Sequence, residues 1–468
     1  MVNDFLELCG FEPPEIRAQK ERFETTLEIL NLGPADIEEA IARVNRYYDV
    51  DLLSIRKILG IWIKELVDMV LAKQENKKVV YASMPPNYQF VAAMSSAADD
   101  IYCIIPETIL GTVIGSIFGK MTPILEAAEG AGLPPGNAFC SFLQTRLGAI
   151  KKGIIPMPDL AVPSCYICDH SPKVDELLNE IYGVPVVYID NPFEERGDQW
   201  PNVIDQRRVK YIARDMEVAA EQFGDLFGCP ITESKARQVI AEEGRLFKAA
   251  SSLCDLLEMD PVPIRQNSLK IAQELASICS RRCVQEGPAV LAQLRQEVEQ
   301  RAEGDKRRLP KGAPRIMFTM APFDPAIVEM VEDLGLAISA TALSPPAVTA
   351  PVGQWENASV WEEIADTLLR RRGSQYSSTA TINQYKGLAR QYQVDGAILF
   401  HHIGCRQYCN WIPQGQVRIE KELGIPVIAL EGDFIDSREY SAAQIRNRLE
   451  PFAQMVRASA GNKTGRGL

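Results

Sequence analysis

Histidine is scarce in this chain, and its sequence has neither a membrane-spanning run nor an excess of positive charge. Only three histidines occur in 468 residues, at His170, His401 and His402. No segment reaches the roughly 18–20 uncharged apolar residues that a membrane-spanning helix requires. The formal net charge of -12 argues against DNA or RNA as the main partner, because nucleic-acid-binding proteins present basic surfaces.

The first residues also lack the basic region and the apolar core of a signal peptide. We therefore expect a cytoplasmic protein, in which the 11 cysteines stay reduced and serve as free thiols or metal ligands rather than disulfides. Hydrophobic residues make up 46% of the chain and charged residues 24%, which is an ordinary balance for a globular protein. The length allows two or three domains with well-buried cores.

Cysteine is grouped at three places in the sequence. Cys165 is followed by Cys168, Cys405 is followed by Cys409, and Cys140 stands alone. Each group falls where a strand-like run gives way to a loop, and all three histidines lie beside the two pairs. Thiolates gathered from several loops are what an iron–sulfur cluster or a zinc ion binds. We therefore expect a metal cofactor held by these cysteines.

Two simpler interpretations of the cysteines stay open. Free cysteine is among the most buried residue types, so the thiols could be packing residues without a ligand. A zinc-stabilised structural protein is the other alternative, although two pairs so far apart in the sequence are unusual for a compact zinc module. The clustering at expected strand ends favours a metal cofactor for redox chemistry.

The hydrophobic pattern divides the chain into five segments. We expect a helical N-terminal segment over 1–75, an α/β domain over 76–205, a helical bridge over 206–305, a second α/β domain over 306–460 and a disordered tail over 461–468. The first segment carries apolar side chains at helical spacing, namely Ile55, Ile58, Leu59, Trp62 and Leu66.

Strand-like runs alternate with helical stretches in both α/β segments, which predicts two doubly wound domains with mostly parallel sheets. In such sheets a ligand binds beyond the carboxyl ends of the strands, so the cysteine loops can converge on one interdomain cleft. Strands are expected at 77–82, 101–105, 160–162, 185–189, 315–319, 396–400 and 426–430.

Two further features bear on the chemistry. Glu107 closely follows the strand expected at 101–105, where a carboxylate could act as an acid or base, although a solvated loop acid would look the same in sequence. The run from Gly115 to Lys120 is similar to a phosphate-binding loop, but it is one residue short and Met121 stands in place of the required Ser or Thr. If ATP is involved, we expect another protein to bind it.

Several segments together carry a family resemblance. They are 397–406 with Cys405, 424–436, 444–450, 139–142 with Cys140, Arg146 and Gly148, and 168–185 with Cys168 and Lys173. Over most of residues 77–457 the chain resembles the iron–sulfur subunits of 2-hydroxyacyl-CoA dehydratases and of ATP-dependent, class I benzoyl-CoA reductases. The segments 106–108, 127–129 and 140–142 are more similar to the benzoyl-CoA reductase side.

The resemblance implies a [4Fe-4S] cluster with Cys140, Cys168 and Cys405 as its ligands. Cys165 and Cys409 are additional candidates for cofactor binding, because one branch of the family is similar to proteins that hold a double-cubane [8Fe-9S] cluster. Cys103 could contribute to such a larger site.

The resemblance also implies an enzyme of anaerobic metabolism, either an iron–sulfur oxidoreductase or a lyase. A low-potential cluster would pass one electron to an acyl-CoA thioester and form a ketyl-type radical. In a dehydratase this radical expels the 2-hydroxyl group, whereas in a reductase electrons and protons accumulate on the substrate. From their positions alone, Glu107 or His402 could supply a proton.

The expected partners follow from the same resemblance. They are an acyl-CoA substrate, a separate ATP-hydrolysing iron–sulfur activator and a homologous second subunit, with a homodimer as the alternative assembly. The main alternative function is a homodimeric double-cubane reductase of small molecules that uses no CoA substrate.

Overall fold

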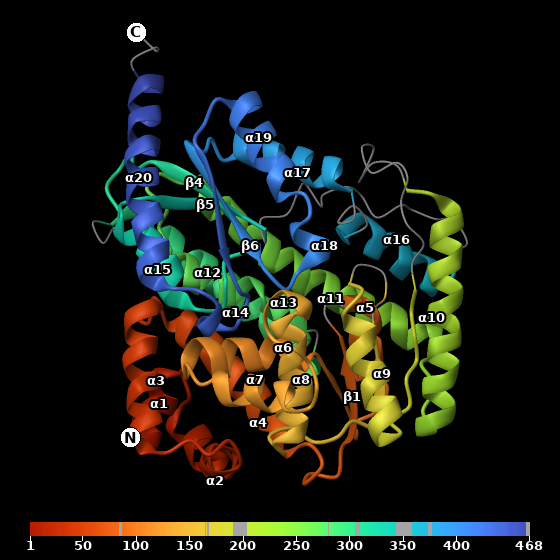
Figure 1. Cartoon of the computed structure of the whole chain (residues 1–468). Coiled ribbons are helices and arrows are strands. Elements are labelled where there is room, and N and C mark those ends of the chain that lie inside the picture. The colour runs from red at the N-terminus through yellow and green to blue at the C-terminus, as the bar shows by residue number, and fades with distance from the viewer. Residues whose placement is uncertain are drawn as a thin grey trace.

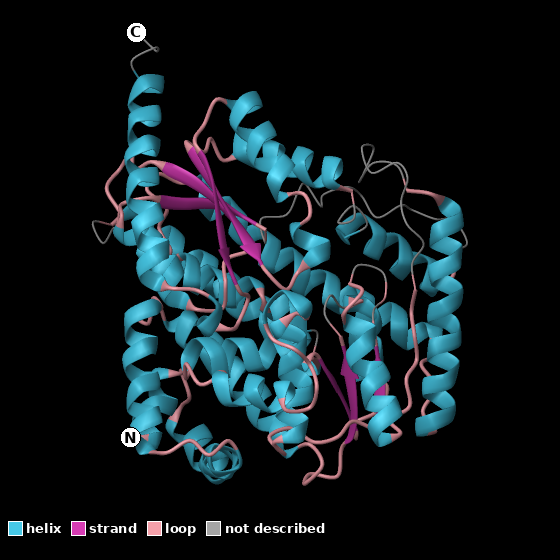
Figure 2. Cartoon of the chain, viewed as in Figure 1, coloured by secondary structure: helices cyan, strands magenta, loops and turns pink. Residues whose placement is uncertain are grey.

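The computed structural model shows two parallel sheets embedded in helices. Figure 1 follows the chain from its red N-terminus to its blue C-terminus, and Figure 2 shows the strands gathered in two separate groups. One sheet has three strands in the order β2-β1-β3, and the other has four in the order β5-β4-β6-β7. The described residues are 1–83, 87–163, 165, 168–190, 204–278, 280–304, 309–342, 358–372 and 377–464.

The N-terminal segment is helical, as predicted. Proline opens two of its helices, where the missing N–H is not needed, and the backbone N–H of Gly33 donates to the Asp36 carboxylate at 2.8 Å to cap one of them. The helices are α1 (Val2–Leu8), α2 (Pro13–Ile29), α3 (Pro34–Tyr47) and α4 (Leu53–Leu71).

The first α/β region contains the three-stranded sheet, in which β1 pairs in parallel with both neighbours. Its strands are β1 (Lys78–Ala82), β2 (Ile101–Ile104) and β3 (Leu160–Val162). Its helices are α5 (Tyr88–Ser95), α6 (Pro106–Ile109), the π-helix η1 (Leu110–Ile117), α7 (Thr122–Glu129), the short η2 (Gly136–Ala138), α8 (Ser141–Lys151) and α9 (Ser171–Tyr182).

The bridge that follows consists of helices joined by short loops in its described residues, in agreement with the sequence pattern. Its elements are α10 (Gln206–Phe227), α11 (Glu233–Ser252), η4 (Leu253–Glu258), α12 (Gln266–Gln273), α13 (Leu275–Ile278) and α14 (Arg281–Glu303).

The second α/β region contains the four-stranded sheet, whose pairings are all parallel. Its strands are β4 (Arg315–Thr319), β5 (Ala337–Thr341), β6 (Gly396–His402) and β7 (Val427–Gly432). Its helices are α15 (Pro325–Asp333), α16 (Val360–Arg372), α17 (Ser378–Gln391), α18 (Arg406–Cys409), α19 (Ile412–Leu423), η5 (Ser437–Glu439) and α20 (Ala442–Thr464).

The four-stranded sheet is covered by helices on both faces. Ile316 and Phe318 of β4 belong to a buried cluster with side chains of α15 and α20. Met317, which lies between them and points to the opposite face, belongs to the main core with side chains of α17 and α19. The parallel pairing and the two covered faces confirm the predicted α/β class.

In each sheet, two neighbouring strands are followed by connections that leave toward opposite edges of the sheet. β1 lies between β2 and β3 in the first sheet, and β4 lies between β5 and β6 in the second. Such a switch point creates a crevice beyond the carboxyl ends of the strands. Cys165 and Cys168 follow β3 and Cys405 follows β6, so both cysteine loops leave their sheets at a switch point.

The structure departs from the sequence predictions at three places. The strand expected at 185–189 is wrong, because this stretch forms only an isolated parallel bridge between Val186 and Ala161. β5 was not predicted, since its Ala-Ile-Ser-Ala-Thr sequence has little strand character. α20 continues to Thr464, into the segment expected to be a tail, and residues 465–468 lie outside the described residues.

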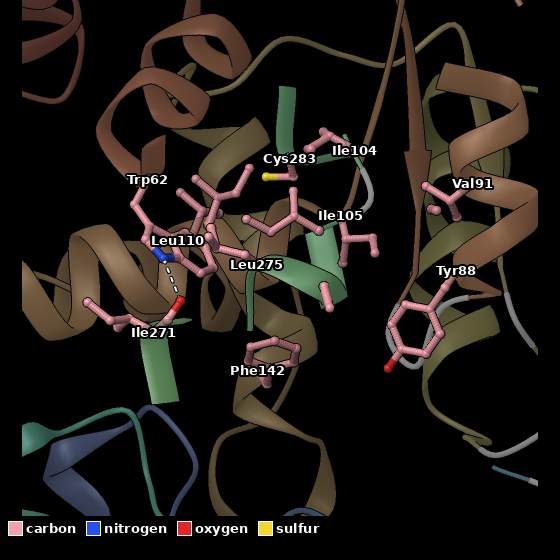
Figure 3. Close-up of a cluster of buried hydrophobic side chains, with 14 of the residues drawn as sticks. Trp62, Tyr88, Val91, Ile104, Ile105, Leu110, Phe142, Ile271, Leu275 and Cys283 are labelled. Carbon is pink, nitrogen blue, oxygen red and sulfur yellow. Dashed lines mark hydrogen bonds between the residues drawn. The ribbon is translucent and has the colours of Figure 1, made fainter. Parts of the chain in front are cut away.

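One core joins the helical segments to the first sheet (Figure 3). Trp62 of α4 is fully buried, and its indole N–H donates to the backbone carbonyl of Ile271 in α12 at 3.0 Å. Leu275 of α13 and Cys283 of α14 lie in the same cluster. The domain boundaries drawn from the sequence stay predictions. Among the described residues, no helix is long and apolar enough to cross a membrane.

Replacing Gly148 with Ala tests the packing of α8 against α7. A Cβ at Gly148 would lie 2.0 Å from the carbonyl oxygen of Ile124, so the two helices would have to separate. We expect the free energy of unfolding in urea, followed by circular dichroism, to fall by about 3 kcal/mol.

Gly244 of α11 provides the matched control, because an added Cβ there meets nothing within 4 Å. Gly244→Ala should be neutral or stabilise the protein by up to about 1 kcal/mol through its higher helix propensity. Equal stabilities of the two variants would contradict the described contact between α7 and α8.

Candidate metal centre

Cys140, Cys168 and Cys405 come from three loops and lie within electrostatic reach of one another. Cys140 directly precedes α8, Cys168 lies between β3 and α9, and Cys405 directly precedes α18. Burial raises the pKa of the Cys140 thiol well above its usual range, and the nearby Cys405 and Cys168 sulfurs raise it further. Burial raises the pKa of Cys168 to about 12, with Cys405 as the next contribution.

The loop that carries Cys405 touches the loop that carries Cys140 through its backbone. A Cβ placed on Gly404 would lie 2.7 Å from the carbonyl oxygen of Phe139 and 3.0 Å from the Cα of Cys140. Only glycine allows such a close approach without displacing the neighbouring backbone. This contact brings the two cysteine loops of the separate α/β regions side by side.

Two polar contacts beside the cysteines also join the two α/β regions. The Ser141 hydroxyl donates to the carboxylate of Asp433, which follows β7 and also accepts two backbone N–H groups at 2.9 Å each. Nη2 of Arg406 donates to the Asp169 carboxylate at 2.6 Å. Ser141, Asp169 and Arg406 directly follow the three cysteines. Each of them therefore forms a contact between one α/β region and the other.

Backbone amides at two helix starts face the sulfur atoms. The N–H of Leu143 opposes the rise in the pKa of Cys140, and the N–H groups of Ser171 and His170 do the same for Cys168. Amides at the first turn of a helix have no partner within the helix, so they can donate to a thiolate. They favour the anionic form that a metal ligand requires.

The chemistry of the donor set fits a thiophilic metal. Cys140, Cys168 and Cys405 are thiols rather than disulfides in the described structure, in which no three His, Cys, Asp or Glu side chains are already arranged at metal-binding distances. Three neighbouring, partly buried thiolates repel one another, and a positively charged metal core would offset that repulsion. Thiolates select zinc or iron–sulfur clusters over hard cations such as Mg²⁺.

The other candidate cysteines have different surroundings. Burial raises the pKa of Cys165 to about 12, and its nearest charges are those of Asp190 and Asp175, with Cys168 contributing least. Cys409 is buried one helical turn after Cys405, and its backbone N–H donates to the Cys405 carbonyl at 3.2 Å. Burial alone raises the pKa of Cys103, which places it in the core. The predicted ligand roles of Cys165 and Cys409 stay predictions.

Glu107 is fully buried in α6, so the alternative of a solvated loop acid is wrong. Its Oε1 lies 2.9 Å from Nε of Arg146, whose side chain is also fully buried. Burial raises the pKa of Glu107 to about 7, and the charge of Arg146 opposes the rise. A carboxyl group with this pKa exchanges its proton near neutral pH, as a proton donor must. Its catalytic role stays a prediction.

His402 is buried and packed against neighbouring side chains. Its Nε2 donates to the carbonyl oxygen of Met320 at 2.8 Å, and its ring packs on Phe434 with the centroids 4.3 Å apart. Burial lowers the pKa of His402 to about 3, so the ring is neutral at pH 7. These contacts suit a positioning residue, because they hold the loop that carries Cys405 against the loop after β4. The role of His402 as a proton donor stays a prediction.

Sequence reasoning gave no specific role to several residues that build the site. Arg146, which it named only as part of the Cys140 motif, is the one charged residue between Ser141 and Ile150 of α8, a signal that could have marked it. Asp433 follows a strand, where a carboxylate was expected to cap the next turn or to reach toward the cleft, whereas Asp175 gave no signal because its partners lie far away in the sequence. His170 stacks on Phe139 with ring centroids 4.6 Å apart, a contact that no spacing rule indicates.

Comparison with known proteins identifies the family that the chain resembles over most of its length. A family model described as 2-hydroxyglutaryl-CoA dehydratase, D-component, matches residues 90–456. The chain is 25% identical over 339 residues to (R)-2-hydroxyglutaryl-CoA dehydratase, subunit alpha, of Acidaminococcus fermentans, which covers 72% of this chain and 68% of that protein.

Two further relatives differ in their named reactions. The (R)-phenyllactyl-CoA dehydratase alpha subunit of Clostridium sporogenes is 23% identical over 350 residues, which is 72% of this chain and 81% of that protein. A benzoyl-CoA reductase subunit of Thauera aromatica is 23% identical over 416 residues, which is 82% of this chain and 90% of that protein.

Replacing Glu107 with Gln should flatten part of the pH dependence of stability. Because burial raises the folded-state pKa to about 7, the stabilising contribution of this group is complete below its unfolded pKa and is lost as pH rises through 7. Gln does not titrate, so the free energy of unfolding of the variant relative to the natural chain should rise by about 3 kcal/mol between pH 4.5 and pH 8.

Urea unfolding of the metal-free protein across this pH range measures the effect. Glu65→Gln serves as a comparison, because burial also raises the pKa of Glu65 to about 7 at a site in contact with Arg282 and Ser280. In the double variant, the change in the free energy of unfolding caused by Glu65→Gln should add to the change caused by Glu107→Gln. A difference between Glu107→Gln and the natural chain that is the same at every pH would show that Glu107 does not titrate as described.

Proposed function

This chain belongs to the 2-hydroxyglutaryl-CoA dehydratase, D-component, family, and from that premise we propose that it is the iron–sulfur subunit of an enzyme acting on an acyl-CoA thioester. The reaction is either the dehydration of a 2-hydroxyacyl-CoA or the reduction of an aryl- or enoyl-CoA. The observation that carries the proposal is that three thiols, Cys140, Cys168 and Cys405, lie within electrostatic reach of one another on three loops, two of which touch through their backbones at Gly404.

We assign Cys140, Cys168 and Cys405 as the ligands of a [4Fe-4S] cluster. Three protein thiolates leave one iron of such a cluster open for an exchangeable ligand. When bound, the cluster supplies single electrons at low potential for the reduction of the thioester. The protein contributes the orientation of the three sulfurs, through the Gly404 contact and the amides of Leu143 and Ser171.

Partial burial of the site supports chemistry that water would quench. Phe142, which lies in the first turn of α8 after Cys140, stacks on Phe323 with centroids 5.4 Å apart, and its ring centroid is 5.3 Å from that of Phe434. An apolar, water-poor shell lowers the reduction potential of a cluster, because it disfavours the more negatively charged reduced state. We propose Glu107 as the group that holds and releases a proton, through a carboxyl whose pKa lies near 7.

The assembly is proposed from the relatives. Each of them is named as one subunit of its enzyme, which supports a complex of this chain with a second, homologous subunit. A homodimer is the alternative, and native mass measurement after coexpression with a paralogue separates the two. We also propose that electrons come from a separate ATP-hydrolysing iron–sulfur activator. Electron transfer that proceeds equally well without ATP would exclude this donor.

A protein that holds a larger cluster is the second candidate function. The positions of Cys165 and Cys409 favour it. Cys165 lies near Cys168, and Cys409 lies one helical turn after Cys405. If both are ligands, the site would hold a double-cubane [8Fe-9S] cluster and could reduce small molecules without CoA. Binding of CoA thioesters to the anaerobic protein would argue against that function.

Substitution of single cysteines distinguishes these sites. We expect about four irons per chain after anaerobic purification, and at least half of this iron should be lost in Cys140→Ser, Cys168→Ser and Cys405→Ser because each removes a ligand. Cys229→Ser is the matched control, since Cys229 is a partly exposed thiol beyond α10. About eight irons, falling in Cys165→Ser and Cys409→Ser, would establish the larger cluster instead. Zinc in place of iron would overturn the redox function.

Glu107→Gln also tests the proposed proton transfer. With (R)-2-hydroxyacyl-CoA thioesters and benzoyl-CoA as trial substrates, we expect kcat to fall at least about 100-fold at unchanged iron content, because the amide cannot supply the proton. KM should change little. Unchanged turnover with an intact cluster would remove Glu107 from this role.

A further inference from the structure

Arg146 lies at the centre of a closed, buried polar network beneath the cysteines. Its Nε is 2.9 Å from Glu107, its Nη1 is 2.5 Å from the Asp175 carboxylate, and its Nη2 donates to the Ser83 hydroxyl at 2.7 Å. Ser83 in turn donates to the other oxygen of Asp175 at 2.7 Å, which closes the ring. All four side chains are fully buried.

The network connects the two helices that begin at the cysteine loops. Arg146 lies in the second turn of α8, which starts directly after Cys140. Asp175 lies in the second turn of α9, which starts shortly after Cys168. The pair therefore fixes the separation of two helices whose first-turn amides face the two sulfur atoms.

The network also ties both helices to the sheet. Ser83 directly follows β1, and Glu107 follows β2 at the same edge. Asp175 and Ser83 accept hydrogen bonds from Nη1 and Nη2 of the guanidinium, and Glu107 lies beside Nε as an ion-pair partner, so the planar fork of arginine sets their relative positions. A lysine ammonium carries the same charge but has no planar fork to hold these partners.

The free energy of folding alone does not explain why these charged side chains are buried together. A buried ion pair loses its hydration, and replacing such a pair with apolar side chains is often neutral or stabilising. Burial keeps the pKa of Glu107 near 7, so a neutral Glu107 leaves Arg146 and Asp175 as one balanced pair of charges. In several proteins the benefit of such buried polar groups is conformational specificity.

We propose that Arg146 and Asp175 are positioning residues that hold the N-terminal ends of α8 and α9 at the separation that the Cys140 and Cys168 ligands require. This inference rests on the proposed iron–sulfur function and adds to it the device that sets the ligand spacing. The third ligand, Cys405, is positioned by other contacts, since Gly404 and Asp433 hold its α/β region against the start of α8.

The test compares iron content in three variants of the full chain, purified anaerobically. Arg146→Lys keeps the positive charge and removes the fork, and Asp175→Asn keeps the shape and removes the partner charge. Glu243→Gln is the matched control, because Glu243 is buried and forms an ion pair with Arg371 at 2.6 Å between α11 and α16. The readouts are iron and acid-labile sulfide per folded chain and the electron paramagnetic resonance spectrum after reduction.

We expect iron per folded chain to fall at least about twofold in Arg146→Lys and Asp175→Asn, with a shifted spectrum for the cluster that is retained. Glu243→Gln should keep the iron content and the spectrum of the natural chain, even where its unfolding midpoint falls as far. If Arg146→Lys does not fold, Asp175→Asn decides the question.

Natural iron content and an unchanged spectrum in the folded variants would overturn the positioning role and leave the proposed function standing. Absence of iron from the natural chain itself would overturn the proposed function, and with it this inference. The two failures are therefore distinguished by the natural chain, which is measured first.

Discussion

The close backbone contact between Gly404 and Cys140 is the constraint on which the candidate centre depends. It holds the loop after β6 of one sheet against the start of α8 in the other α/β region, so closely that a Cβ added to Gly404 would lie 2.7 Å from the Phe139 carbonyl oxygen. Parallel sheets place their functional loops at one edge, and here two such edges face each other. A site shared in this way is complete only when both regions are folded and joined.

Charge balance shapes the surroundings of that contact. Three neighbouring thiols, the Asp433 carboxylate and the buried Glu107 would place several negative charges in a region with little water. Helix amides offset the charges of the Cys140 and Cys168 thiolates, and the Arg146 guanidinium offsets that of Glu107. Repulsion among the thiolates favours binding of a cationic metal core, whereas burial is what raises the pKa of Glu107 to about 7.

Much of the architecture was predictable because it depends on local patterns. The apolar spacing in α4 and the strand runs of β3 and β4 gave the correct elements, and the grouped cysteines gave the candidate ligands. The stretch at 185–189 has strand-like residues but gains only a single bridge, since pairing depends on partners that local sequence does not specify. Arg146 with Asp175, and Ser141 with Asp433, could not be paired in advance because folding alone brings them together.

An anomalous difference map at the iron absorption edge, from crystals of the full chain grown without oxygen, tests the central claim most directly. Iron density bonded to the sulfur atoms of Cys140, Cys168 and Cys405 is the predicted result. Iron density bonded to other residues, or density at the zinc edge alone, would contradict the account.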